Sequence, residues 1–198
     1  MTTTKKKTTT KRSTTSKPKA TTKIPDLPPN PFVYEVLDLA SKQRSAAKKV
    51  EVLKKYEHDS LKSIFIFNFD ETVISLLPEG EVPYGDAEDQ SVFSGTLSEN
   101  IAAEARGGES ATGQDMDGRG KTSLRREWQN LYHFVKGGND SLNNIRREMM
   151  FINLLRGLHP REAEVLCLVK DGALETKYKV THQNVKDAYP DIIWGGRS

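Results

Sequence analysis

The feature that most constrains the fold is a stretch of helical periodicity between residues 122 and 189. Apolar residues recur in it at spacings of three and four, which places them on one face of a helix. Residues that start and stop helices divide the stretch into four segments. It therefore predicts a compact module of four short helices joined by short loops.

The first two helices of this stretch have well-marked ends and one apolar face each. Thr122 is a suitable N-cap for the first helix, which Gly137-Gly138 ends. Asn139 or Asp140 can cap the second helix, which Gly157 ends. The faces predicted to be buried are Leu124, Trp128, Leu131, Tyr132 and Val135 in the first helix and Leu142, Ile145, Met149, Ile152 and Leu155 in the second.

The third and fourth helices begin at caps that the sequence also marks. His159 precedes Pro160, and proline suits the first position of a helix. Glu162 stands three residues after the cap, where its carboxylate can reach back to the cap N–H. Thr181 can cap the fourth helix, which ends before Pro190.

Three more helical segments are predicted between residues 31 and 77. Asn30 is a suitable N-cap for the first, with Pro31 at its first position. Asp59 or Ser60 can cap the third. Residues 64–69, Ile-Phe-Ile-Phe-Asn-Phe, are so apolar that their pattern fits either a buried strand or a buried helix. We favour a helix because the sequence offers no evident partner strand.

Residues 1–23 consist almost entirely of threonine and lysine, without an acidic residue. Such a segment buries too little surface to offset the chain entropy lost on folding, so we expect a disordered tail. Its positive charge predicts attraction to nucleic-acid phosphates, and a solubilising tail with no specific partner is the alternative. The residues predicted to contact phosphate are Lys5, Lys6, Lys7, Lys11, Arg12, Lys17, Lys19 and Lys23.

Residues 78–121 are predicted to form a long, acidic, glycine-rich loop. Residues 78–118 hold ten acidic residues against Arg106, and a short helix is expected only at residues 98–105. Stretches of this length without secondary structure are usually functional or disordered. Since the loop precedes a basic block, one hypothesis has it fold over the arginines and compete with an anionic partner. A solvated linker is the alternative.

The basic block that follows holds seven of the eleven arginines, between residues 119 and 161. Two arginine pairs lie off the apolar faces of the first two helices. Guanidinium groups bind phosphate in a forked geometry, so these pairs predict an arginine-rich helical face that binds nucleic acid. Pairing with the local acids Glu127 and Glu148 is the alternative. The predicted contacts are Arg125, Arg126, Arg146 and Arg147.

No set of residues predicts an enzyme, a cofactor or a metal site. The single cysteine, Cys167, excludes an internal disulfide and lies in an apolar run that predicts burial. The four histidines have no metal-ligand spacing. Residues 118–123, Gly-Arg-Gly-Lys-Thr-Ser, lack the glycine that a phosphate-binding loop needs at position 115. Residues 158–166 look like the opening helix of a response-regulator helix-turn-helix, but the connection that follows is too long for its tight turn.

The stretch also carries a series of short motifs, among them Ser123-Leu124-Arg125, Leu131-Tyr132-His133-Phe134-Val135, Arg146-Arg147-Glu148-Met149, Gly157-Leu158-His159-Pro160 and Ala188-Tyr189-Pro190-Asp191. With these motifs, residues 32–85 and 122–198 resemble an uncharacterised protein family of T4-like tailed phages, including cyanophages. The basic tail and the acidic loop fall outside the resemblance. It implies a phage product made in a bacterial host, and it supplies no activity and no catalytic residues.

The predicted fold is mainly α, a small helical domain of several short helices with a disordered N-terminal tail and a long acidic loop. Four divisions are predicted along the chain. They are the tail with a proline-rich hinge at residues 1–30, a helical segment at 31–77, the acidic loop at 78–121 and a core helical module at 122–198.

The predicted function is that of a non-enzymatic phage accessory protein that associates with the nucleic-acid backbone through its basic tail and arginine-rich face. The alternative is a virion or protein-interaction component whose partner is a phage or host protein. No cofactor or metal is predicted, and no apolar run is long enough to span a membrane. The expected location is the cytoplasm of a bacterial host, or the virion.

Overall fold

Helix α7 (Pro160–Lys170) lies at the centre of the fold, because α1, α3, α6 and α8 all pack against it. The computed structural model describes residues 24–80, 82 and 121–196. Within those ranges the chain forms eight α-helices, one 3-10 helix and no strand. The prediction of a mainly α, small helical domain is therefore confirmed.

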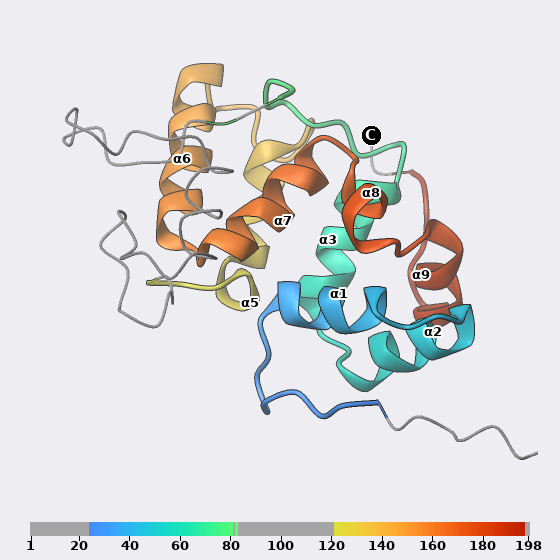
Figure 1. Cartoon of the computed structure of the whole chain (residues 1–198). Coiled ribbons are helices and arrows are strands. Elements are labelled where there is room, and N and C mark those ends of the chain that lie inside the picture. Colours follow the sequence, from blue (N-terminus) through green and yellow to red (C-terminus); the bar gives the residue numbers. More distant parts are fainter. Residues whose placement is uncertain (1–23, 81, 83–120, 197–198) are drawn as a thin grey trace, which may run out of the picture.

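The helices of the two halves of the chain interleave around α7 (Figure 1). The first half contributes α1 (Val33–Ser41), α2 (Ala46–Lys55) and α3 (Asp59–Phe69). The second half contributes α5 (Leu124–Glu127), the 3-10 helix η1 (Trp128–Phe134), α6 (Asn144–Gly157), α8 (Leu174–Tyr178) and α9 (His182–Ala188). Helix α2 packs against α1 and α9, and α3 packs against η1 and α5.

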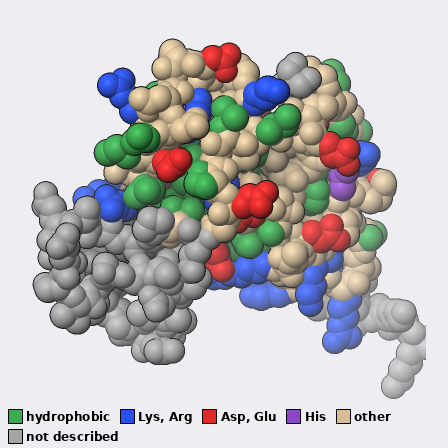
Figure 2. Space-filling model, turned by 90° about the horizontal axis from the view of Figure 1, so that it is seen from above, with side chains coloured by type: hydrophobic (Ala, Val, Ile, Leu, Met, Phe, Trp, Pro, Cys, Tyr) green, Lys and Arg blue, Asp and Glu red, His purple; other side chains and the backbone are tan. Residues whose placement is uncertain are grey.

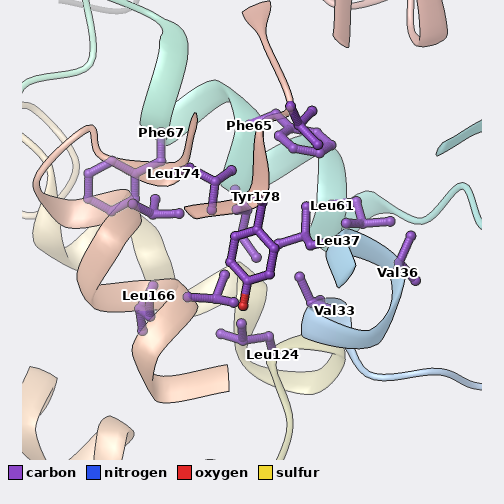
Figure 3. Packing of buried hydrophobic residues seen from close by; sticks show 14 of the residues in the cluster. Val33, Val36, Leu37, Leu61, Phe65, Phe67, Leu124, Leu166, Leu174 and Tyr178 are labelled. Atoms are coloured by element: carbon purple, nitrogen blue, oxygen red, sulfur yellow. The ribbon is translucent and has the colours of Figure 1, made fainter. Parts of the chain in front are cut away.

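One hydrophobic cluster joins these two halves. Tyr178 of α8 lies among Leu37 of α1, Leu124 of α5 and Leu166 of α7 (Figure 3). All four side chains are buried. Removing apolar surface from water stabilises by about 25 cal/mol per Å², so this shared core holds the halves together.

Several predicted helices and caps are confirmed. Residues 64–69 lie in α3, so the ambiguous apolar run is a helix. His159 is the N-cap of α7, where its Nδ1 accepts the backbone N–H of Arg161 at 3.1 Å. The Thr181 hydroxyl accepts the N–H of Asn184 at 3.2 Å and caps α9.

The single long helix predicted after Thr122 is wrong. Helix α5 is only four residues long, and the chain continues as η1 before it becomes extended at Val135. The carbonyl of Phe134 accepts the N–H of Leu76 at 2.9 Å, and Val135 pairs with Ser75. These backbone bonds to residues 75 and 76 take the place of the bonds that a regular helix would make here, because a backbone N–H or C=O group that is paired with a distant segment is not available to its own helix.

The buried face predicted for the second helix of this stretch is also wrong. Helix α6 is capped by Asn143, not by Asn139 or Asp140. Ile145 and Met149 are 71% and 58% exposed, while the opposite side of the helix is buried. That buried side consists of Arg147, Phe151 and Leu155. Phe151 packs edge-on against Phe134 of η1 at a centroid distance of 5.2 Å, which fixes the rotation of α6.

Three more sequence predictions need correction. The N-cap of α1 is Phe32 rather than Asn30. The N-cap of α3 is His58, whose Nδ1 accepts the N–H of Ser60 at 3.0 Å. The carboxylate of Glu162 does not reach back to the cap of its own helix but turns into the core, where it accepts backbone N–H groups of α1 and α5.

Candidate nucleic-acid interface

A cleft of about 480 Å³ lies where the N-terminal ends of α1, α3 and α5 meet. The first N–H groups of a helix have no partner inside it, which gives its N-terminal end a partial positive charge. Anions are favoured at such ends. At α1, the carboxylates of Glu35 and Glu162 already accept the first N–H groups. The cleft is lined by Asn30, Pro31, Phe32, His58, Lys121, Thr122, Ser123, Arg125 and Arg126.

Arg125 forms a fixed part of the cleft wall. Its Nε donates a hydrogen bond of 2.9 Å to the carbonyl of Pro31, just before α1. Burial lowers the pKa of Arg125, and the nearby Glu162 carboxylate opposes that shift. The guanidinium starts from so high a pKa that it stays charged at neutral pH.

His58 is held neutral beside this arginine. Its Nδ1 caps α3, which leaves the other ring nitrogen as the N–H donor. Burial lowers the pKa of His58, and the charge of Arg125 lowers it further. His58 therefore contributes a polar edge to the cleft rather than a positive charge.

Two exposed cations, Lys121 and Arg126, line the same cleft. The neighbouring acid, Glu127, accepts hydrogen bonds of 2.8 Å from the Thr122 hydroxyl and the Asn130 amide. Its carboxylate is thus engaged with neutral groups. This arrangement brings Arg125, Arg126 and Lys121 together around one space.

The C-terminal end of α2 adds two lysines to this side of the protein. Lys54 and Lys55 are exposed, and Lys55 pairs with Asp26 in the segment that enters the fold. The segment 24–31 then runs under α1 to the cleft (Figure 1). Figure 2 shows Lys and Arg side chains gathered along one edge of the molecule. We use the term basic edge for the cleft residues Lys121, Arg125 and Arg126 together with Lys54 and Lys55 at the end of α2.

The other predicted arginine pair, Arg146 and Arg147, lies away from this cleft. Both belong to the first turn of α6, whereas the N–H of Thr122 bonds to the carbonyl of Gly157 at the last turn. The 14 residues of α6 span about 21 Å at 1.5 Å per residue. The two pairs therefore do not form one continuous face.

Arg147 differs most from its predicted role. Only 3% of it is exposed, and its guanidinium holds together the turn before α6. Nε donates to the carbonyl of His133 at 2.9 Å, and one terminal nitrogen donates to the carbonyls of Asn139 and Leu142. The other terminal nitrogen donates to the side chain of Asn144. With all three nitrogens engaged, Arg147 is not available to a phosphate.

The predicted contacts of the tail lie outside the described residues. So do the short helix expected at residues 98–105 and the glycines of the rejected phosphate-loop motif. The tail contacts in question are Lys5, Lys6, Lys7, Lys11, Arg12, Lys17, Lys19 and Lys23.

The sequence interpretation missed Lys54, Lys55, Lys121 and His58. A signal for the two lysines was available, because six basic residues and one acid fall between residues 42 and 55. No pattern in the sequence marks His58, since it joins the cleft through the cap of α3.

The described parts of the chain offer little support for a metal site, a reactive cysteine or a membrane-spanning helix. No group of three His, Cys, Asp or Glu side chains within them is placed to hold a metal ion. Burial raises the pKa of the Cys167 thiol to about 12, which leaves it unreactive at neutral pH. None of the helices between residues 24 and 196 that the structure describes is long and apolar enough to cross a membrane.

A family model, described as a family of unknown function (DUF6433), matches residues 36–108 and 111–176, which is well over half of the chain. The chain belongs to the DUF6433 family. The DUF6433 match runs through most of the acidic segment, so the expectation that this segment lies outside the family is wrong. Residues 1–23 lie outside the match. No curated protein and no solved structure matched the chain.

Proposed function

We propose that this protein is a non-enzymatic phage accessory protein that binds the phosphate backbone of nucleic acid, through its basic edge and residues 1–23. The main support for the proposal is the cleft at the starts of α1 and α3, which is lined by Arg125, Arg126 and Lys121. Phosphate contacts of this kind position a protein on nucleic acid without reading its sequence. The phage host cell is the proposed setting, based on the resemblance of the sequence motifs.

The path of the chain supports the proposal that residues 1–23 and the basic edge bind the same nucleic acid. The segment that follows residue 23 passes the end of α2, where the N–H of Leu27 donates to the Tyr56 hydroxyl at 2.8 Å. It then reaches the cleft at Asn30. We therefore expect cations of the tail and of the fold to contact one polyanion, and each neutralised phosphate releases counterions.

Titration of labelled single-stranded and duplex oligonucleotides with the full chain, at several salt concentrations, tests the proposal. We expect binding in the micromolar range or tighter at low salt. Each cation removed should reduce the slope of log K against log salt by roughly 0.7–0.9. Deletion of residues 1–23 and the double variant Lys121→Glu, Arg126→Glu should each weaken binding.

The matched control is the double variant Lys136→Glu, Lys186→Glu. It makes the same change in charge at two exposed positions outside the basic edge. We expect a smaller loss of affinity for this control than for the cleft variant. Equal losses would show that only net charge matters, and no binding at low salt would favour the alternative of a virion or protein-interaction component.

A further inference from the structure

An aromatic side chain lies among the cations of the cleft. Phe32, the N-cap of α1, lines this space together with Arg125 and Lys121. Its side chain is only partly buried, whereas Val33 and Val36 after it are enclosed in the core. Grooves that bind single strands combine positive charge for the backbone with aromatic rings on which bases stack. The cleft contains both kinds of group.

The residues around Phe32 fix the position of its ring. The ring stacks on Tyr34 at a centroid distance of 5.6 Å, with 16° between the two planes. It also lies 5.5 Å from the ring of the buried His159. The backbone N–H of Phe32 donates to the carboxylate of Glu35 at 2.8 Å. A side chain that is already fixed in this way loses little conformational entropy when a ligand stacks on it.

A guanidinium group is fixed to the same wall of the cleft. Nε of Arg125 donates at 2.9 Å to the carbonyl of Pro31, the residue directly before Phe32. This hydrogen bond ties the cation to the segment that carries the ring. Lys121 and Arg126 are exposed and line the same cleft. A π surface for a base and positive charges for phosphates therefore lie within one space.

The volume of the cleft suits an unpaired nucleotide. At about 480 Å³, it falls within the range of roughly 300–1,000 Å³ that is usual for pockets that bind small organic ligands. In a duplex, neighbouring base pairs cover the faces of each base, and exposing a base costs the free energy of unstacking and unpairing. An unpaired nucleotide can stack its base on the ring without this cost.

We infer that the cleft binds single-stranded nucleic acid, with an unpaired base stacked on Phe32 and the adjoining phosphates held by Lys121, Arg125 and Arg126. This inference rests on the proposed function and names the class of nucleic acid that the cleft takes. The phenyl ring has no hydrogen-bonding group, so it stacks on a base without reading the sequence. Single strands of DNA and of RNA share the chemistry that the cleft recognises.

Titration of the full chain against labelled oligothymidylate, oligouridylate and a duplex of equal length, at one low salt concentration, tests the inference. Phe32→Leu keeps an apolar side chain but removes the ring. We expect this variant to bind single strands on the order of tenfold more weakly, with a much smaller change for the duplex. Phe32→Trp keeps a stacking ring and should retain the affinity for single strands. The more tightly bound of the two single strands tells whether the ligand is DNA or RNA.

The matched control is Tyr132→Leu, which removes a ring that is 49% exposed and lies outside the cleft. Equal losses of single-strand affinity in Phe32→Leu and Tyr132→Leu overturn the inference, and so does an unchanged affinity in Phe32→Leu. In both cases the proposed function stands if the variant Lys121→Glu, Arg126→Glu still weakens binding. Absence of binding to all three nucleic acids at low salt overturns the proposed function and the inference together.

A second measurement leaves the chain unchanged and so does not depend on the folding of a variant. Single strands that contain bromouracil cross-link on irradiation to aromatic rings in contact with the base, and mass spectrometry locates the modified peptide. We expect the main product to carry the modification at Phe32. Cross-links found only at residues outside the cleft overturn the inference.

Discussion

The carboxylate of Glu162 and the backbone N–H of Val33, 129 residues apart in the sequence, form a buried hydrogen bond of 3.0 Å. The second carboxylate oxygen accepts the N–H of Leu124 at 2.9 Å. Glu162 itself stands in the first turn of α7. One side chain therefore joins the first turns of α1, α5 and α7 and satisfies N–H groups that those helices leave unpaired.

Replacement of Glu162 by alanine should lower the free energy of unfolding by about 2–5 kcal/mol, because two buried N–H groups lose their acceptor. Urea denaturation followed by circular dichroism at pH 7 measures the change. The control is Glu51→Ala on the exposed side of α2, for which we expect a change within about 0.5 kcal/mol. Similar values for the two variants would contradict the bridging role.

The same carboxyl predicts a dependence of stability on pH. Burial raises the pKa of Glu162 from 4.5 to about 7, although the two N–H donors and Arg125 oppose the shift. Between these pH values the unfolded chain has lost a proton that the folded chain keeps, so stability falls as pH rises. The stability of the wild type relative to Glu162→Gln should fall by up to about 3 kcal/mol from pH 4.5 to 7. Denaturation at several pH values measures it, and a constant difference would contradict the raised pKa.

For His159 we predict that stability depends on pH with the opposite sign. Its ring stacks on Tyr34 at a centroid distance of 4.9 Å, and burial, assisted by Arg161, lowers its pKa from 6.5 to about 4. The unfolded chain takes up the proton first, so stability falls as pH decreases from 6.5 to 4. His159→Asn keeps a capping oxygen but does not titrate. The wild type should lose up to about 3 kcal/mol relative to this variant over that range, and thermal melts at each pH test the sign.

Adjacent arginines on α6 should differ sharply in their effect on stability. Arg147→Ala removes the donors of the His133, Asn139 and Leu142 carbonyls, and should lower the free energy of unfolding by about 2–4 kcal/mol. Arg146→Ala changes an exposed residue of the same turn and should stay within about 0.5 kcal/mol. Urea denaturation of both variants at pH 7 makes the comparison. If the two arginines proved equivalent, the buried position of Arg147 would be contradicted.

The sequence marks only part of the cleft that we propose as the binding site. Clustering of arginine pointed to Arg125 and Arg126, and the structure gathers both with Lys121 at one cleft. The sequence could not separate this pair from Arg146 and Arg147. Both pairs have the same residue type at similar helix positions, and only packing decides which guanidinium is buried.

The rotation of α6 shows why periodicity has this limit. The sequence offers apolar residues on two sides of the helix, at Ile145 and Met149 and at Phe151 and Leu155. Both sets have helical spacing, so pattern alone does not choose between them. The contact of Phe151 with Phe134 and the hydrogen bonds of Arg147 settle which side enters the core.

The sequence by itself determined the helical class and the caps at His159 and Thr181. These features follow from spacing and from hydrogen bonds between residues close in the chain. The tertiary structure decided the buried face of α6, the break between α5 and η1, and the partners of Glu162. Each of these depends on backbone groups or side chains brought together from distant parts of the chain, and local propensity carries no information about such contacts.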